Sequence, residues 1–482
     1  MTSRRTFLEL AGGSALAAVT SSGKNTSTSR KAREPRVSAQ GHGDLLALQQ
    51  HFVDLRFGMF LHFNMATFQD REWGDPTSQP NLFSPTGLDT DQWAAAAKSA
   101  KMTWGCLTTR HHDGFCIWPT KTSGDSIAKT SHKTDVVRAY ADSFRKAGLR
   151  VGLYYSILSL RDDIRHFNIT PQKIQLIKDQ LTELFTNYGE IDILITDGWD
   201  APWSRISYEE VPFRAIYDHI KSLQPQCLIC DLNASNYPTD GLYYSDIKAF
   251  EQNAGQRVPP DSDLPALSCV TITDGWFWKQ ADIHGQLKSA DTVVNQWLVP
   301  LNRRHCNLIL NAPPTREGKL APDVVERLAE IGRLWTPEPP VERLAAHTTI
   351  TTPNLATGKP IRASSSPDTI GPDLANDGLF RTAWSPDERD SSPWLDIDLQ
   401  GEHKLSVVAI VQGQSDRPSS AIKSFRFESW DGARWITIAS SPSPGPTTIL
   451  AIPSVSSRRI RVHLEPGSYP LSVADIGLYN EP

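Results

Sequence analysis

The chain has 482 residues, of which 39% are hydrophobic and 21% charged, with a formal net charge of −5 at pH 7. This length exceeds what one hydrophobic core usually organises, so we expect two globular domains. The slight acidic excess argues against nucleic acid or an anionic membrane surface as a partner, because both require a basic face. The sequence has no run of 18 apolar residues, so we expect no membrane insertion.

The N-terminus resembles a twin-arginine export signal. Arg4-Arg5 precede a short apolar run with an A-x-A pattern at residues 15–17. Residues 19–40 are rich in Ser, Thr, Lys and Arg, and we expect a disordered spacer there. The signal and the spacer together occupy residues 1–40. They predict that the mature protein is periplasmic or extracellular.

Because a twin-arginine substrate folds before export, the six cysteines are not required to form a disulfide framework. Cys227 and Cys230 have the C-x-x-C spacing of redox and zinc sites, but they lie in an apolar run and no second pair matches them. This context favours buried structural thiols.

Residues 41–335 alternate short apolar runs with amphipathic helical patterns, which is typical of βα units around a parallel sheet. The clearest unit begins with Thr170-Pro171, an N-cap followed by proline at the first helical position, and it ends at Gly189. Eight strand-like runs favour a TIM-type (β/α)8 barrel: 57–63, 102–108, 150–155, 191–196, 227–231, 243–247, 270–273 and 306–310. Polar or aromatic residues follow these runs, where barrel enzymes carry their chemistry.

The pattern changes after W-T-P-E-P-P (335–340), which breaks the helical periodicity and indicates a linker over residues 336–350. Residues 351–482 contain short alternating strands separated by Gly, Pro and Ser clusters, with no long helix. We therefore expect an all-β jelly-roll sandwich as the second domain.

Several polar and aromatic side chains follow the predicted barrel strands. Taken singly, each has an ordinary structural explanation, such as a helix cap or an ion pair. Together they favour cleavage of a glycosidic bond, which needs two carboxylates across the scissile bond and further groups that hold sugar hydroxyls. The candidates are His62, Glu72, Trp73, His111, His112, Tyr154, Asp197, Trp199, Glu251 and Trp276.

Five blocks resemble, in order, those of α-L-fucosidases of glycoside hydrolase family 29: F-G-M-F-L-H (57–62), R-E-W-G (71–74), H-H-D-G-F (111–115), G-L-Y-Y-S (152–156) and N-L-I-L-N-A-P-P (307–314). The resemblance implies a retaining exo-glycosidase that hydrolyses terminal α-L-fucosyl linkages through a covalent fucosyl-enzyme intermediate. It implies fucosylated oligosaccharides or glycoconjugates as substrates, and no required cofactor or catalytic metal.

The same resemblance implies the two catalytic carboxylates. Asp197, in I-T-D-G-W (195–199), matches the family nucleophile, and its neighbour Asp200 is the alternative. Glu251, in a block that begins at Ser245, matches the general acid/base of one branch of the family, with Asp246 as the alternative.

The remaining candidates match positions that bind the sugar. His62, Glu72, Trp73, His111 and His112 match contacts to the fucose hydroxyls, Trp276 matches a wall of the sugar site, and Tyr154 and Trp199 complete the predicted substrate-binding set. Two departures from the family weaken any prediction of substrate preference. Arg110 stands where a lysine is usual, and the arginine that often lies beside the nucleophile has no counterpart near D-L-N (231–233).

The C-terminal segment resembles discoidin-like domains, also called coagulation-factor type C domains or carbohydrate-binding module family 32. The resemblance rests on N-L-A-T-G-K (354–359), A-N-D-G (375–378), W-L-D-I-D-L (394–399) and D-I-G-L-Y (475–479). These framework residues indicate the fold and leave open whether the domain binds glycan, or a structural calcium at the Asn-Asp-Gly segment.

Two other functions remain as alternatives. A metal-dependent barrel hydrolase would use His62, His111, His112 and Asp197 as ligands. We expect adjacent histidines at a strand end to point to opposite sides, which disfavours a shared metal. A non-catalytic glycan-binding protein on a degenerate barrel is disfavoured because both candidate carboxylates are present. The sequence predicts neither the fucosyl linkage nor the oligomeric state.

Overall fold

The computed structural model describes residues 42–482 except 123–124, 234–236, 281–285, 340–342, 368–369, 414–420, 443 and 468–469. The predicted export signal and spacer therefore lie outside the described residues, as does part of the predicted linker. In the described part of the chain, no helix is long and apolar enough to cross a membrane.

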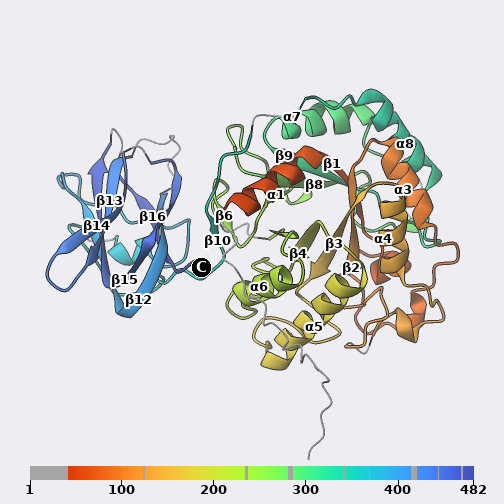
Figure 1. Ribbon diagram of the computed structural model, residues 1–482, viewed down its shortest axis with the longest axis horizontal. Coiled ribbons are helices and arrows are strands. Elements are labelled where there is room, and N and C mark those ends of the chain that lie inside the picture. The colour runs from red at the N-terminus through yellow and green to blue at the C-terminus, as the bar shows by residue number, and fades with distance from the viewer. Residues whose placement is uncertain are drawn as a thin grey trace, which may run out of the picture. The chain divides into compact units, whose positions relative to one another are not determined.

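Eight parallel strands form one sheet in the spatial order β5-β4-β3-β2-β1-β9-β8-β7. Their bounds are β1 Phe57–Leu61, β2 Trp104–Arg110, β3 Arg150–Ser156, β4 Ile193–Asp197, β5 Leu228–Asp231, β7 Lys248–Glu251, β8 Ala266–Thr271 and β9 Cys306–Asn311. Hydrogen bonds link β5 to the segment before β7: Asp246 N donates to Ile229 O at 2.7 Å, and Asp231 N donates to Ser245 Oγ at 3.1 Å. The sheet is thus a nearly closed barrel, as predicted (Figure 1).

Helices surround this sheet (Figure 1). The α-helices are α1 His42–Leu55, α2 Met65–Gln69, α3 Thr90–Ser99, α4 Val136–Lys146, α5 Pro171–Asn187, α6 Phe213–Leu223, α7 Val299–Asn302 and α8 Pro322–Leu334, and a π-helix spans Thr292–Leu298. Short 3-10 helices span Pro80–Leu82, Ile127–Lys129, Gln252–Ala254 and Pro372–Ala375. Helix α5 begins as predicted: the Thr170 side chain accepts from Lys173 N, and Pro171 occupies the first turn.

The alternation of side chains along each strand divides the barrel into an inner and an outer core. Phe60, Tyr154 and Ile195 belong to a buried cluster inside the barrel, and Phe52 of α1 packs into the same cluster. Leu194, next to Ile195 in β4, belongs instead to the larger cluster between strands and helices. All six cysteines are free and buried, which confirms the prediction of structural thiols.

The bounds of one predicted barrel strand were wrong. The run 243–247 does not form one strand: β6, Leu242–Tyr243, pairs with β10, Thr349–Ile350, whereas residues 245–247 lie beside β5 and the barrel strand β7 starts at Lys248. The reason is a turn at Tyr244, whose φ of 50° lies in the left-handed region and interrupts the extended chain. Strand β8 also begins earlier than predicted, at Ala266.

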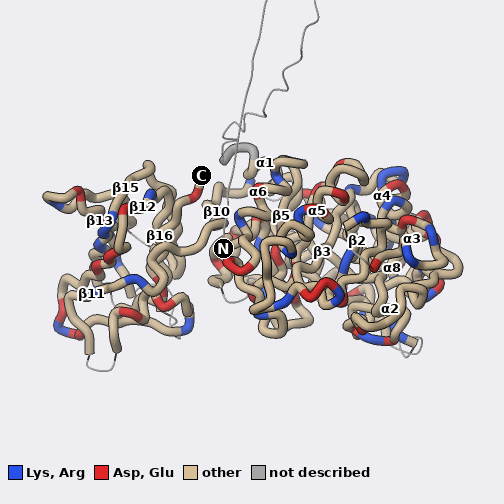
Figure 2. The backbone as a smooth tube through the Cα atoms, turned by 90° about the horizontal axis from the view of Figure 1, so that it is seen from below, with Lys and Arg blue, Asp and Glu red and all other residues tan. Residues whose placement is uncertain are grey.

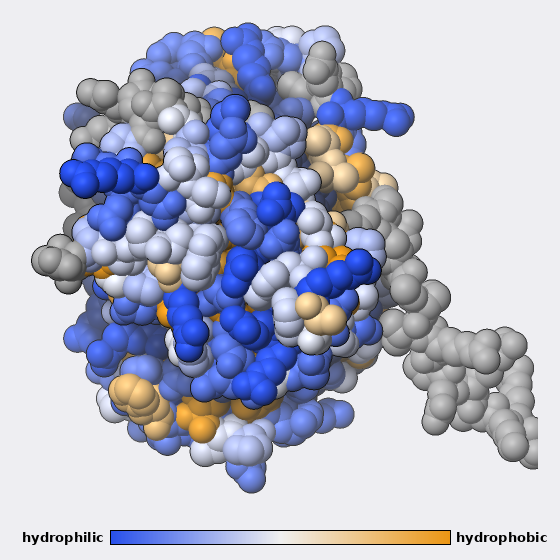
Figure 3. All heavy atoms as spheres, turned by 90° about the vertical axis from the view of Figure 1, so that its left-hand side faces the viewer, coloured by the Kyte–Doolittle hydropathy of each residue, from blue (hydrophilic) through white to orange (hydrophobic). Residues whose placement is uncertain are grey.

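The C-terminal domain is all-β, as predicted. Its strands are β11 Ile361–Ala363, β12 Trp394–Gln412, β13 Ile422–Trp430, β14 Trp435–Ser441, β15 Thr447–Pro466 and β16 Val473–Tyr479. They form an antiparallel sheet in the order β11-β12-β15-β13-β14, with β16 paired to β12. A separate buried cluster that includes Trp384, Phe427 and Val462 fills this domain. The face of the domain seen in Figure 3 is mostly hydrophilic, and acidic and basic residues are interspersed in both domains (Figure 2).

Candidate active site

Candidate functional side chains gather at the carboxyl ends of the barrel strands, which is the catalytic face of TIM-type barrels. Each of the eight barrel strands, or the loop that follows it, contributes: His62 after β1, His111 and His112 after β2, Tyr154 in β3, Asp197 at the end of β4, Asn233 after β5, Glu251 at the end of β7, Trp276 after β8 and Asn311 at the end of β9. The barrel therefore brings together residues that are far apart in the sequence.

Two hydrogen-bond donors hold the carboxylate of Asp197, and His112 lies beside it. The Tyr154 hydroxyl donates to its Oδ2 at 2.6 Å, and the Asn233 amide donates to its Oδ1. His112 Nε2 lies 3.6 Å from Oδ2. Burial, followed by the negative charge of Asp197, raises the pKa of Tyr154 well above its usual value, so this phenol remains a donor. Asp197 is 9% exposed, and its carboxylate has one fixed orientation at the base of the site.

Glu251 has the properties of a proton donor. Burial, and then the negative charge of Asp197, raise the pKa of Glu251 to about 7, while a hydrogen bond with Trp276 partly opposes this rise. At neutral pH a substantial fraction of this carboxyl is protonated. Two carboxyl groups in different environments, one of them able to hold a proton, are what general acid catalysis at a glycosidic bond requires.

The three site histidines are neutral at physiological pH. Burial lowers the pKa of His62 to about 3, although its hydrogen bond with Asn311 opposes this, and burial lowers the pKa of His112 to about 4. Burial also lowers the pKa of His111 well below its usual value. His62 Nδ1 lies 2.7 Å from Asn311 Oδ1, and His112 Nδ1 lies 2.8 Å from Ser156 Oγ. A neutral imidazole both donates and accepts, so these rings suit sugar hydroxyls.

His111 and His112 do not point to opposite sides, contrary to our expectation. Their ring centroids are 3.9 Å apart, with the ring planes tilted by 45°. The rule of alternation fails because β2 ends at Arg110, so both histidines lie beyond the strand. Within the described residues, His, Cys, Asp and Glu side chains form no group of three or more that could hold a metal ion.

Glu72 and Trp276 join the loops after β1 and β8. The backbone N–H of Trp276 donates to Glu72 Oε2 at 2.9 Å, and Lys279 forms an ion pair with the same carboxylate. The Trp276 ring packs against His62, with centroids 4.9 Å apart. Trp73 lies further out, with its ring 4.6 Å from that of His112. Each of these predicted residues therefore lies at the site.

Trp199 has a packing role instead of the predicted substrate contact. Its side chain is fully buried, its indole N–H donates to Val211 O at 3.0 Å, and its ring packs against Tyr208 and Phe213. It belongs to the outer core because the chain turns at Gly198, whose φ is 95°. Trp199 thus anchors the loop after β4.

Asp246, the alternative acid/base, is also structural. It is fully buried, accepts hydrogen bonds from Ile229 N at 3.0 Å and the Tyr217 hydroxyl at 2.9 Å, and forms an ion pair with Lys221. Through these contacts the Asp246 carboxylate helps to close the barrel between β5 and β7, and it is not directed into the site.

Sequence reasoning missed three residues of the site: Asn233, Asn311 and Trp203. Asn233 follows β5 by two residues, so its place after a strand end was a usable signal. Asn311 stands inside the N-L-I-L-N-A-P-P block. Trp203 lies in an irregular loop, and no periodicity marks it.

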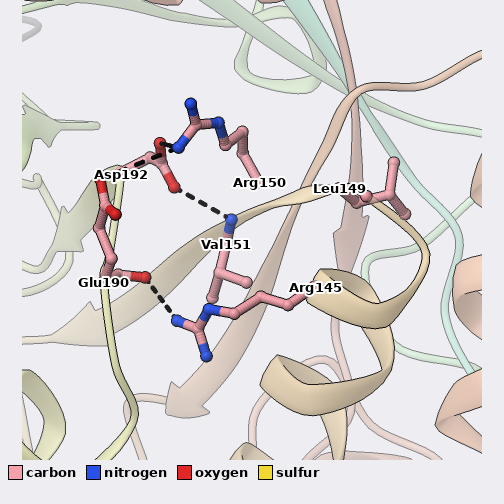
Figure 4. Close-up of a pocket in the computed structure, with 7 residues that line it drawn as sticks. Arg145, Leu149, Arg150, Val151, Glu190 and Asp192 are labelled. Atoms are coloured by element: carbon pink, nitrogen blue, oxygen red, sulfur yellow. Dashed lines mark hydrogen bonds and ion pairs between the residues drawn. The ribbon is translucent and has the colours of Figure 1, made fainter.

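A cavity at the opposite end of the strands is lined by Arg145, Leu149, Arg150, Val151, Glu190 and Asp192 (Figure 4). Arg150 pairs with Asp192 at 3.3 Å, and Asp192 Oδ2 accepts from Val151 N at 3.3 Å. The Arg145 guanidinium donates to Glu190 O. These charged and polar groups bind one another at the amino ends of β3 and β4, the face of TIM-type barrels that serves stability and not chemistry.

The Asn-Asp-Gly segment of the C-terminal domain forms several hydrogen bonds within that domain. The Asp377 carboxylate accepts from Leu379 N at 2.8 Å and from Thr382 Oγ1 at 2.7 Å. The Asn376 amide donates to Ala356 O at 2.7 Å and Lys359 O at 2.9 Å. These contacts hold the segment in place, and the calcium ion stays a prediction.

Comparison with solved structures supports the barrel fold. A glycoside hydrolase 29 family member from an unknown rumen bacterium is similar, with a TM-score of 0.50 and 21% sequence identity over 90% of this chain and 77% of that one.

Sequence comparison identifies relatives. Alpha-L-fucosidase 1 of Arabidopsis thaliana is 25% identical over 449 residues, which cover 87% of this chain and 84% of the relative. Human tissue alpha-L-fucosidase is 24% identical over 329 residues, which cover 60% of this chain and 68% of the relative. A model of the F5/8 type C domain matches residues 360–476, and the C-terminal domain is of this type. Because the alpha-L-fucosidase family model matches residues 69–337, more than half of the chain, this protein belongs to the α-L-fucosidase family of glycoside hydrolases.

Proposed function

We propose that this protein is a retaining exo-α-L-fucosidase that releases terminal fucosyl residues from oligosaccharides or glycoconjugates. The observation that carries the proposal is the pair of carboxyl groups with different roles. Asp197 is held as an acceptor by Tyr154 and Asn233, and Glu251 has a pKa of about 7.

The first step forms a covalent intermediate. Asp197 attacks the anomeric carbon while Glu251 gives its proton to the departing glycosidic oxygen. Tyr154 and Asn233 keep the carboxylate of Asp197 aimed at the sugar. They also prevent the loss of geometry that a freely rotating side chain would cause.

The second step reverses the role of Glu251. Once the leaving group has gone, Glu251 is ionised and accepts a proton from water, which attacks the anomeric carbon and releases Asp197. Two inversions at the same carbon give net retention. This mechanism requires the two carboxyl groups to lie about 5–5.5 Å apart when the sugar is bound.

The neutral histidines and Trp276 bind the sugar in this proposal. His62, His111 and His112 exchange hydrogen bonds with the hydroxyls. His111 is suited to this because its buried Nδ1 has no hydrogen-bond partner among the described residues. The ring of Trp276 provides an apolar wall against the methyl group that replaces the 6-hydroxyl in fucose.

The proposal is tested by the configuration of the first product. Proton NMR should show α-L-fucose as the first anomer released from an α-L-fucoside, with equal rates with and without a chelator. A β-anomer released first would overturn the retaining mechanism. Loss of activity with chelator would favour the metal-dependent hydrolase, and binding of fucosylated glycan without any turnover would favour the non-catalytic protein.

We also propose that the mature protein acts outside the cytoplasm, on the periplasmic or extracellular side. This proposal rests on Arg4-Arg5 and the short apolar run that follows them.

A further inference from the structure

Two exposed tryptophans form the outer rim of the site on one side. Trp73 is 39% exposed and Trp203 is 43% exposed, although large aromatic side chains are usually buried. Their ring centroids are 4.8 Å apart in an edge-to-face arrangement. Both rings also contact His112, at 4.6 Å for Trp73 and 4.3 Å for Trp203. His112 in turn lies 3.6 Å from the carboxylate of Asp197. One histidine ring therefore separates this aromatic pair from the proposed nucleophile.

Exposure increases from the floor of the site to this rim. Tyr154 is 1% exposed, His62 is 4% exposed and Asp197 is 9% exposed, so the groups that would hold the terminal sugar lie deep. A glycosidase that removes a terminal residue places that residue in the deep part, and the rest of the glycan must leave through the open side. The rim is thus the place where the next sugar ring passes.

The loop after β4 holds Trp203 in a defined position. Asp200 N donates to Ile206 O at 2.8 Å, and Arg205 N donates to Ala201 O at 2.8 Å, so both sides of the turn are joined. Asp200 and Arg205 have φ values of 48° and 59°, a backbone conformation that non-glycine residues rarely adopt. Buried Trp199 anchors the base of the loop. Because the loop is already closed in this way, the Trp203 indole at its tip loses little conformational entropy when a ligand binds.

We propose that Trp203, which packs edge-to-face against Trp73, binds the first sugar ring of the leaving group. An indole face complements the apolar C–H face of a pyranose, and a preformed aromatic surface discriminates a glycan leaving group from a small one. This inference rests on the proposed fucosidase function. It adds a specificity residue that acts on the aglycone and takes no part in bond cleavage.

The test compares two substrates that differ in the leaving group. α-L-Fucosyl fluoride has no aglycone sugar, whereas a fucosylated disaccharide has one. We expect Trp203→Ala to lower the ratio of kcat/KM for the disaccharide to kcat/KM for the fluoride by about tenfold, which corresponds to about 1.4 kcal/mol. Trp203→Phe, which keeps an aromatic face, should restore part of this ratio. Phe167→Ala, at a side chain that is 86% exposed and belongs to a different loop, is the matched control and should not change the ratio.

Each other outcome overturns the inference. An equal loss for both substrates would show that Trp203 contacts the fucosyl ring or supports the fold. An unchanged ratio with unchanged rates would show that the rim does not bind the leaving group. If the wild-type protein hydrolyses neither substrate, the proposed function itself fails, and the inference fails with it.

Discussion

The Tyr154 hydroxyl donates a 2.6 Å hydrogen bond to Oδ2 of Asp197, from the middle of one barrel strand to the end of the next. Removal of this donor by Tyr154→Phe should lower kcat/KM for an aryl fucoside by about 10- to 100-fold, since a hydrogen bond to a charged group contributes about 1.5–3 kcal/mol. Thermal unfolding should show a smaller effect, because the ring remains packed. A rate equal to that of the wild type would refute the role of Tyr154 in holding the nucleophile.

The pKa of Glu251 predicts the alkaline side of the pH profile. Because burial and Asp197 raise this pKa to about 7, the protonated acid is present below about pH 7 and is lost as the pH rises through that value. The rate for a substrate with a poor leaving group should fall accordingly. Glu251→Gln cannot titrate, so its residual activity should lack this descending limb. A limb that persists in Glu251→Gln would assign the titration to another group.

The nucleophile and the acid can be separated by chemical rescue. Asp197→Gly should lower turnover by about 10,000-fold or more, and azide should restore part of it by entering the vacated space and giving a glycosyl azide of inverted configuration. Glu251→Ala should retain activity on aryl fucosides with good leaving groups in the first step, because they need little protonation. If azide instead rescued the Glu251 variant with inversion and did not rescue the Asp197 variant, Glu251 would be the nucleophile and Asp197 the acid/base.

Strand β10 of the linker and strand β16 of the C-terminal domain contact the barrel domain near β6. Strand β10 pairs with β6, and Tyr479 of β16 belongs to the same buried cluster as Tyr243. Tyr479→Ala should therefore lower the free energy of unfolding by about 3–5 kcal/mol, as for other buried aromatic residues. Ile436→Ala, at a side chain that is 37% exposed, is the control and should change it by less than about 0.5 kcal/mol.

A truncation after residue 339 tests the same contacts. The catalytic set lies in the barrel, so a truncated protein that still folds should hydrolyse a small fucoside, but it should unfold at a lower temperature because β6 loses its partner. An unchanged unfolding temperature would show that these contacts add nothing to the barrel.

The export signal is tested by its two arginines. Replacement of Arg4-Arg5 by Lys-Lys should retain the precursor in the cytoplasm, as measured by fractionation and immunoblotting. An unchanged periplasmic or secreted yield would refute the twin-arginine interpretation.

The sequence by itself determined the barrel, the all-β second domain and the place of Asp197 at the end of a strand. These features depend on local patterns. Apolar runs of strand length alternate with helical periodicity, and Asp197 directly ends such a run. The blocks that resemble the family place the histidines and Trp73 after strand ends, and these ends lie on one face of the barrel because its strands are parallel.

Only the tertiary structure decided how the side chains beyond the strand ends are arranged. The Asn233 amide meets Asp197 across 36 residues of sequence, and no local pattern encodes such a contact. The turn at Gly198 directs Trp199 into the core and leaves Trp203 at the rim. The left-handed turn at Tyr244 interrupts the extended chain, so β7 begins only at Lys248. The physical reason is the same in each case. Alternation fixes side-chain direction within a strand, but past its end the backbone dihedral angles and the packing of neighbouring loops decide it.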